Sequence, residues 1–187
     1  MKRRRNISIK TKLLGIIIPV VIAIVVVLVL VAYEMSSGII ENYSESLLES
    51  SVVNQANEIE AWLEQNIASF QSAKRTIEKI NPNDSELQNM LDGYYGFNDN
   101  YPDGIYIADS SGKFMKASES KKTESDVTQS VWYKEGLTRI NMKVGSAYKN
   151  SEGINVISAS AMLNDGSDNV RVISADMTLD RIAIIVN

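Results

Sequence analysis

The sequence predicts an α+β protein whose first helix crosses a membrane. Three observations lead to this prediction: residues 13–33 carry no charge, residues 34–80 follow a helical pattern, and residues 104–177 alternate between strand segments and turns. Because helices precede a run of strands, we expect one antiparallel sheet with helices packed on it. The 187 residues are enough for an anchor and one ordinary domain with its own core.

The uncharged stretch from Leu13 to Tyr33 matches a membrane-spanning helix in length and composition. As a helix its 21 residues rise roughly 31 Å, and the hydrocarbon core of a bilayer is about 30 Å thick. A helix also satisfies its own backbone polar groups, as lipid requires. The alternative is a cleaved secretory signal, whose apolar region is usually about 7–15 residues long. The longer stretch, together with the poor cleavage site at residues 30–32, favours an anchor.

A basic arm at residues 1–12 precedes the anchor and predicts its orientation. The arm holds six Lys and Arg residues and no acid. Basic flanks of a membrane helix stay in the cytoplasm, so residues after Tyr33 are expected outside it. An external domain without cysteine fits a bacterium better than an animal cell. We therefore expect a single-pass protein of the bacterial plasma membrane, with a cytoplasmic N-terminus and an extracytoplasmic C-terminal domain.

Charge and composition exclude several classes of function. All 23 acidic residues lie beyond Tyr33, which leaves the external residues a formal charge of −10 and argues against nucleic-acid binding. The chain has no Cys and no His, so disulfides, Cys/His zinc sites, Cys nucleophiles and Ser-His-Asp triads are ruled out. Residues 164–168 are acidic but lack the spacing of a calcium loop. We expect no enzyme activity, no metal and no cofactor.

Residues 34–80 predict one long extracytoplasmic helix. Apolar or small residues recur at steps of three or four from Leu48 to Ile80, which makes a continuous stripe along one helical face. The proline in residues 81–82 ends the helix. Such a helix is expected to leave the membrane as a stalk, to pack on a domain, and to pair with a second copy in a homodimer. The alternative is two shorter helices with a break near residue 50.

A strand-rich module is expected over residues 81–187. One of Asn83, Asp84 and Ser85 caps a second helix that ends near Tyr95. The elements that follow are expected to be a hairpin of strands 104–108 and 113–117, a short helix 131–139, strands 147–149, 154–163 and 170–177, and a last helix capped by Thr178.

Three stretches line up with a known family: residues 126–134, 147–150 and 172–177. With the long helix and anchor before them, they resemble the distal module of the double Cache sensor domains of bacterial chemoreceptors. Residues 7–14 resemble the start of a methyl-accepting chemotaxis protein. The resemblance implies a PAS-like antiparallel sheet, with the proximal module absent from this chain. It also implies that the module binds a small extracellular ligand, often an amino acid or an amine.

The resemblance assigns the ligand pocket to Trp132, Tyr133, Tyr148 and Asp176. A buried carboxylate at Asp176 complements a ligand ammonium, and charge-assisted hydrogen bonds are about twice as strong as neutral ones. The aromatic faces add cation–π attraction of about 0.5–2 kcal/mol each. Structural roles are the alternatives: core packing for the three aromatic residues, and a cap on Thr178 for Asp176.

The residues before the Trp-Tyr pair narrow the ligand class. Asp126 and Thr128 match the family's pattern, but Ser130 stands where amino-acid-binding members carry an arginine that grips the ligand carboxylate. The resemblance places Asp126 and Ser130 in the ligand site. The missing arginine favours an amine, or another ligand without a carboxylate, over an α-amino acid. Lys121 or Lys122 is a candidate replacement for the arginine.

The function expected from the resemblance is ligand sensing in chemotaxis, with binding transmitted through the long helix. The same sensor attached to a histidine kinase or a cyclic-dinucleotide enzyme is one alternative. A ligand-free, membrane-tethered coiled-coil scaffold is another. The chain ends within an apolar helix at residues 182–186, so we expect it to be an N-terminal fragment, or a short gene product, of a longer receptor.

Overall fold

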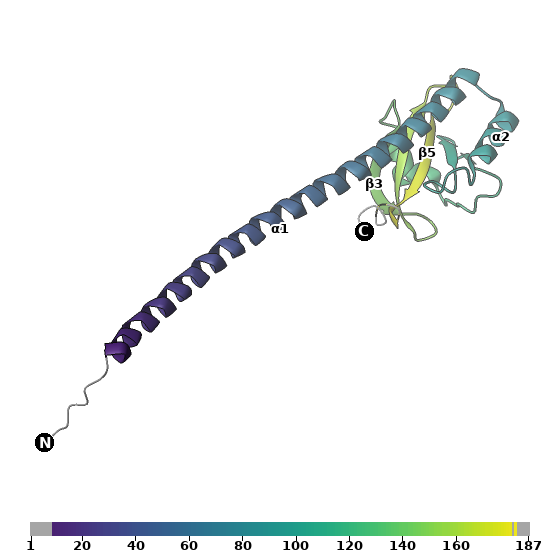
Figure 1. Cartoon of the computed structure of the whole chain (residues 1–187). Helices are drawn as coiled ribbons and strands as arrows, with labels where there is room; N and C mark the ends of the chain where they lie inside the picture. The colour runs from purple at the N-terminus through teal and green to yellow at the C-terminus, as the bar shows by residue number, and fades with distance from the viewer. Residues whose placement is uncertain (1–8, 181, 183–187) are drawn as a thin grey trace. The chain divides into compact units, whose positions relative to one another are not determined.

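The computed structural model describes residues 9–180 and residue 182 (Figure 1). Two compact units make up the chain, residues 1–54 and residues 55–187. Helix α1 (Ile9–Ile80) contributes to both units. Its helical backbone is unbroken, so the prediction of one long helix is confirmed and the alternative of two shorter helices is wrong.

The described part of the first unit is helical throughout, and its large apolar side chains are exposed. Among the described residues, α1 is the one helix that is long and apolar enough to cross a membrane. That property agrees with the anchor expected at residues 13–33, while the crossing itself stays a prediction. Further apolar side chains are exposed beyond this stretch, at Ile39, Ile40, Leu47, Leu48, Val52 and Val53.

The apolar stripe predicted along α1 is buried only in its last part. Phe70, Ala73 and Ile77 are 0–2% exposed, whereas Leu48 is 66% exposed. Ile80, the last residue of the predicted stripe and of the helix, is 60% exposed. The domain core therefore uses only the part of the stripe that belongs to the second unit.

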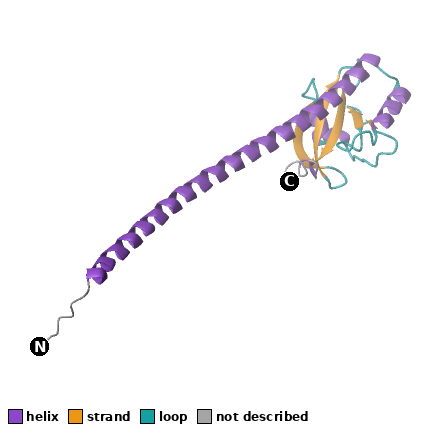
Figure 2. Ribbon diagram, viewed as in Figure 1, coloured by secondary structure: helices purple, strands orange, loops and turns teal. Residues whose placement is uncertain are grey.

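Five antiparallel strands form the sheet of the second unit, in the order β2-β1-β5-β4-β3 (Figure 2). The strands are β1 (Ile105–Asp109), β2 (Phe114–Met115), β3 (Lys143–Lys149), β4 (Asn155–Leu163) and β5 (Arg171–Thr178). Strand β5 lies in the middle and pairs with β1 on one side and β4 on the other. Consequently the residues from Val172 to Met177 are all buried.

One face of the sheet packs against the last part of α1 and against α2 (Asp84–Tyr94). The buried side chains of this layer include Phe70, Ala73, Ile77, Leu87 and Leu91 from the helices and Ile105, Ile107, Ile173, Ala175 and Met177 from the sheet. Every second residue of each strand contributes, as the period of a strand requires. The α+β prediction, with a long helix on one antiparallel sheet, is confirmed.

The opposite face carries a second, smaller cluster together with α3 (Val131–Gly136) and the 3-10 helix η1 (Val127–Gln129). Its buried members are Tyr106, Ala108, Val127, Trp132, Tyr133 and Val172. Helix α3 approaches the sheet closely at Gly136, where an added Cβ would lie 2.3 Å from Val172 Cγ1. Only glycine allows this approach without displacing the buried valine.

The bounds of three elements differ from the prediction by more than one residue. Helix α3 ends at Gly136 rather than at residue 139, and β2 has only two residues. Strand β3 begins at Lys143 rather than at residue 147. The register of β3 against β4 shifts between Val144 and Ala147, and such an irregularity interrupts the two-residue alternation by which a strand is recognised.

The two ends of the strand-rich module agree with the prediction as far as the structure describes them. Asn83 is the cap of α2: its side chain accepts hydrogen bonds of 3.0 Å from the backbone of Ser85 and of Glu86. At the other end, Thr178 is the last residue of β5, and helical backbone begins at Leu179. Most of the predicted last helix lies outside the described residues.

Candidate functional site

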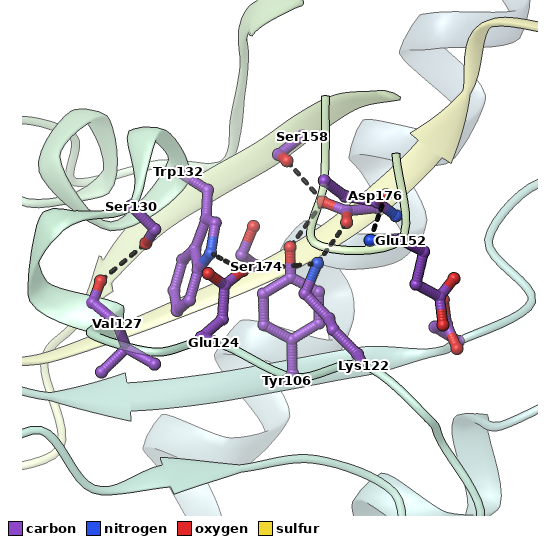
Figure 3. A network of polar contacts seen from close by, with 12 residues as sticks. Tyr106, Lys122, Glu124, Val127, Ser130, Trp132, Glu152, Ser158, Ser174 and Asp176 are labelled. Carbon is purple, nitrogen blue, oxygen red and sulfur yellow. Dashed lines mark hydrogen bonds and ion pairs between the residues drawn. The ribbon is translucent and has the colours of Figure 1, made fainter. Parts of the chain in front are cut away.

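Asp176 lies at the centre of a buried polar network (Figure 3). It is 5% exposed, and its side chain points to the sheet face that carries Tyr106 and Trp132. Its neighbours in β5 point to the opposite face, toward α1. The residue directly opposite Asp176 on β4 is Ser158. The carboxylate is therefore buried inside the sheet, on the face away from the long helix.

Three hydroxyl groups donate hydrogen bonds to one oxygen of this carboxylate. Asp176 Oδ1 accepts from Tyr106 at 2.5 Å, from Ser158 at 2.5 Å and from Tyr148 at 3.2 Å. The donors come from β1, β4 and β3, so the sheet itself assembles the site. A buried carboxylate requires such partners because an unpaired buried charge is costly.

The second carboxylate oxygen is bound by a lysine of the same chain. Lys122 Nζ lies 2.5 Å from Asp176 Oδ2, and the Lys122 residue is 2% exposed. Figure 3 shows the ammonium pointing at the carboxylate. The same nitrogen lies 4.5 Å from the centroid of the Tyr106 ring, within cation–π range, and 3.9 Å from Glu124 Oε1. Asp176 is thus paired with an internal ammonium in this structure.

The segment that carries Lys122 is held in place by hydrogen bonds that its backbone makes with nearby side chains. Lys116 Nζ donates hydrogen bonds of 2.6 Å to the carbonyl oxygens of Ser120 and of Lys122. The Lys122 backbone N–H donates to Ser120 Oγ at 3.2 Å, and Ser120 Oγ donates to Asp103 at 3.1 Å. These bonds fix the backbone of Lys122, so its side chain enters the site from a fixed position.

The Trp-Tyr pair of α3 lies beside the network, and its two members differ in role. Trp132 is 0% exposed, stacks edge-on against Tyr106 with a centroid distance of 4.8 Å, and directs its Nε1 to Glu124 at 3.4 Å. Tyr133 donates its hydroxyl to the carbonyl of Val170 at 3.3 Å. Trp132 therefore contacts the residues around Asp176, whereas the hydroxyl of Tyr133 is bonded elsewhere.

The side chains of Asp126 and Ser130 serve the turn in which they stand. Asp126 caps η1 by accepting hydrogen bonds from the Thr128 backbone at 3.0 Å and from the Thr128 hydroxyl at 2.6 Å. The Ser130 hydroxyl donates to the Val127 carbonyl at 2.6 Å, away from Asp176 in Figure 3. Their place in the ligand site stays a prediction that these contacts do not support.

The tyrosine hydroxyls of the network are held in their protonated form. Burial raises the pKa of Tyr106 well above its usual value, and the Asp176 charge raises it further. Burial and then the same charge also raise the pKa of Tyr148. Both hydroxyls therefore remain hydrogen-bond donors at neutral pH.

The structure thus brings the predicted site residues Tyr148 and Asp176 together and sets Trp132 beside their network, while their ligand-binding role stays a prediction. Sequence reasoning missed Tyr106 and Ser158. Each residue has a hydroxyl group and stands between two apolar residues of a buried strand, and this pattern could have marked it as a candidate. It considered Lys122 only as a partner for a ligand carboxylate, and the structure directs Lys122 to Asp176 instead.

A hollow of about 350 Å³ opens at the other end of β1 and is lined by Asp84, Asp109, Lys113, Asp168 and Arg171 among others. Its two cationic side chains are already paired: Lys113 with Asp84 at 2.6 Å, and Arg171 with Asp165 at 2.8 Å. We therefore regard the network around Asp176 as the stronger candidate site.

Comparison with protein families identifies the module. A family model described as "Methyl-accepting chemotaxis protein-like, first PDC sensor domain" matches residues 59–184. The chain belongs to this family. The match covers the buried part of α1, the whole sheet and every residue of the network around Asp176. The chain is therefore a chemoreceptor-type sensor domain, which senses rather than catalyses. No curated protein matches it.

Solved chemoreceptor domains share the fold of this sensor domain. The ligand-binding domain of Pseudomonas fluorescens CtaA, in complex with L-isoleucine, is 21% identical, with a TM-score of 0.60 over 70% of this chain and 55% of that one. The corresponding domain of Pseudomonas aeruginosa PctC, in complex with GABA, is 19% identical, with a TM-score of 0.67 over 77% and 68%. That of Pseudomonas aeruginosa PctB, in complex with L-Arg, is 15% identical, with a TM-score of 0.53 over 68% and 54%. The sensor domain spans little more than half the length of the CtaA and PctB domains.

Proposed function

We propose that this chain is the extracytoplasmic ligand-sensing portion of a transmembrane chemoreceptor, and that it binds a small amine or amino-acid-like molecule at the network around Asp176. The family match over residues 59–184 carries the proposal. Structures of the same fold were solved with L-isoleucine, GABA and L-Arg, and each of these ligands contains an ammonium group. Support within this chain comes from a buried carboxylate beside aromatic rings.

The chemistry at Asp176 suits an ammonium ligand. The Lys122 ammonium that occupies it has a carboxylate oxygen at 2.5 Å and the Tyr106 ring at 4.5 Å. A ligand ammonium is recognised by the same two features, a charge-assisted hydrogen bond and a cation–π contact. The Ser130 hydroxyl is bonded to its own turn and supplies no guanidinium for a ligand carboxylate. An amine is therefore favoured over an α-amino acid.

The first unit supports the proposed membrane attachment and dimerisation. Residues 13–33 are the expected span, and the basic arm before them is the expected cytoplasmic end. Beyond the span, exposed apolar side chains such as Leu48 and Val52 are available to pair with a second copy of the helix. We propose that ligand binding is transmitted through α1 of such a homodimer, which requires ligand contacts that differ between two states.

A ligand screen tests the proposal. The full chain in detergent micelles is heated in the presence of amines, amino acids, purines and small carboxylates, and unfolding is followed by tryptophan fluorescence. A ligand at a hundred times its dissociation constant should stabilise the folded state by about 2.7 kcal/mol. The stabilisation should vanish in Asp176→Ala. A well-folded wild-type chain that no compound stabilises would contradict ligand sensing at this site and favour a ligand-free scaffold.

Chemotaxis signalling is the output that the family name indicates. A histidine kinase or a cyclic-dinucleotide enzyme carrying the same sensor is the alternative.

A further inference from the structure

We infer that the side chain of Lys122 is a built-in occupant of the ammonium position on Asp176, and that it determines which ligands the site accepts. The inference rests on the proposed function for the ligand itself. The geometry of the occupied position, in contrast, is observed directly in this chain.

Lys122 meets the requirements of an ammonium ligand at this position. Its Nζ lies 2.5 Å from Asp176 Oδ2 and 4.5 Å from the Tyr106 ring centroid, and the residue is 2% exposed. The remaining oxygen of Asp176 is taken by the hydroxyls of Tyr106, Ser158 and Tyr148. The internal ammonium therefore uses the acceptor oxygen that a ligand ammonium would need.

A ligand ammonium reaches Asp176 only by exchange with Lys122. Both oxygens of Asp176 are already bonded, Oδ1 to three hydroxyls and Oδ2 to Lys122, so a second ammonium would lack an acceptor there. Glu124 Oε1, 3.9 Å from Lys122 Nζ, is the acceptor to which a displaced Lys122 can turn. Lys122 is tethered, and Lys116 and Ser120 fix its backbone, so its effective concentration at the site is high. A simple amine competes poorly against it. A ligand displaces Lys122 only when its other groups add contacts, so the wild-type chain accepts an amine only if it carries further binding groups.

Chemical rescue tests this inference without knowledge of the natural ligand. Lys122→Ala removes the atoms that propylammonium contains, and the thermal unfolding of the full chain is measured with increasing propylammonium chloride. We expect Lys122→Ala to be stabilised saturably, with a half-saturating concentration at least tenfold lower than that of the wild type. Sodium chloride at equal ionic strength is the salt control. Lys121→Ala, which changes the exposed neighbouring lysine, should behave as the wild type.

A folded Lys122→Ala chain that responds to propylammonium no better than the wild type would overturn the inference. Because Lys122→Ala also loses a buried ion pair, a second measurement uses the wild-type chain. Acetylation by a water-soluble active ester is followed residue by residue with mass spectrometry, and exposed Lys121 is the internal reference. Lys122 should react at least tenfold more slowly than Lys121 in the folded chain. Equal rates would also overturn the inference.

The two proposals fail in distinguishable ways. If the ligand screen finds nothing but propylammonium rescues Lys122→Ala, Lys122 occupies the position and the proposed sensing of an amine is wrong. If an amine binds the wild type while the Lys122 labelling rate stays unchanged, the ligand binds elsewhere and Lys122 is a structural residue. An amine that raises the labelling rate of Lys122, but not of Lys121, supports both.

Discussion

The Tyr106 hydroxyl donates a hydrogen bond of 2.5 Å to Asp176 Oδ1, although the two residues are 70 positions apart in the chain. They lie on neighbouring strands, β1 and β5. The ring of the same tyrosine lies 4.5 Å from the Lys122 ammonium. Tyr106 therefore contacts both charges of the buried ion pair, the anion with its hydroxyl and the cation with its ring.

Asp176→Asn should destabilise the second unit strongly, because it removes the closest counter-ion of the buried Lys122 ammonium and leaves only the Glu124 carboxylate at 3.9 Å. Removing one partner of a buried ion pair costs about 3–5 kcal/mol. The free energy of unfolding is measured with urea on the full chain in micelles, using tryptophan fluorescence, since Trp62 and Trp132 both lie in the second unit. The exposed Asp168→Asn is the matched control and should change this free energy by less than about 0.5 kcal/mol.

The double variant Asp176→Asn with Lys122→Met removes both charges. It should recover most of the stability that Asp176→Asn loses, since no uncompensated ion remains. A double variant that is no more stable than Asp176→Asn alone would show that the two charges are not coupled.

The stability of the second unit should fall at alkaline pH, in part because of Tyr106. The unfolded phenol loses its proton near pH 10.0, whereas the folded pKa is raised, so above pH 10.0 the unfolded state holds fewer protons than the folded state. Each such group lowers the free energy of unfolding by about 1.4 kcal/mol per pH unit, until the folded phenol also ionises. In Tyr106→Phe the decline between pH 10 and pH 11 should be smaller by about 1 kcal/mol, because the unfolded phenol is only half ionised at pH 10. Exposed Tyr43→Phe is the control, and identical slopes in Tyr106→Phe and wild type would refute the assignment.

Gly136→Ala should destabilise the sensor domain, because the new Cβ would lie 2.3 Å from Val172 Cγ1 in the core. Overpacking of this kind costs about 1–3 kcal/mol, and the higher helix propensity of alanine offsets it by at most about 1 kcal/mol. Gly93→Ala in α2 is the matched control: a Cβ there meets nothing within 4 Å, so only the propensity gain remains. The free energy of unfolding measured with urea should be highest for Gly93→Ala, intermediate for the wild type and lowest for Gly136→Ala. A stabilised Gly136→Ala would contradict the close packing of α3.

Val52→Cys should form a disulfide-linked dimer in membranes if α1 pairs along its exposed apolar residues. The chain has no native cysteine, so any cross-link arises at the introduced position. Ser50→Cys places the thiol on the opposite helical face and should cross-link much more slowly. Oxidation with copper phenanthroline followed by non-reducing electrophoresis measures both rates. Equal cross-linking at the two positions would argue against a dimer through this face.

Single cysteines also test the predicted orientation in the membrane. Ser151→Cys, in the exposed turn before β4, should react with a membrane-impermeant maleimide added to intact spheroplasts. Lys10→Cys, in the basic arm, should react only after permeabilisation. The reverse labelling pattern would place the sensor module in the cytoplasm.

Local pattern was enough to predict the order of the α-helices and strands of this protein, but not all of their bounds. The uncharged run, the three-and-four spacing along α1 and the alternation in β1, β4 and β5 are each set by side chains close together in sequence. The sensor-domain family was recognisable for the same reason, because its motifs are short runs around Trp132, Tyr148 and Asp176. The bounds of β3 were not predictable, because a register shift between Val144 and Ala147 is decided by pairing with β4.

Only the tertiary structure decided what Asp176 binds. Its place in a buried strand predicted a carboxylate in need of a partner, and a ligand was one candidate for that partner. The partner in the structure is Lys122, 54 residues earlier, on a segment without regular pattern. Which lysine enters a buried site depends on how a loop crosses the sheet, and that path is set by contacts such as those of Lys116 with the loop carbonyls. An ion pair between residues far apart in the chain produces no periodic pattern in the sequence. The pairing of Lys122 with Asp176 is therefore decided only when the sheet and the loop that crosses it have folded.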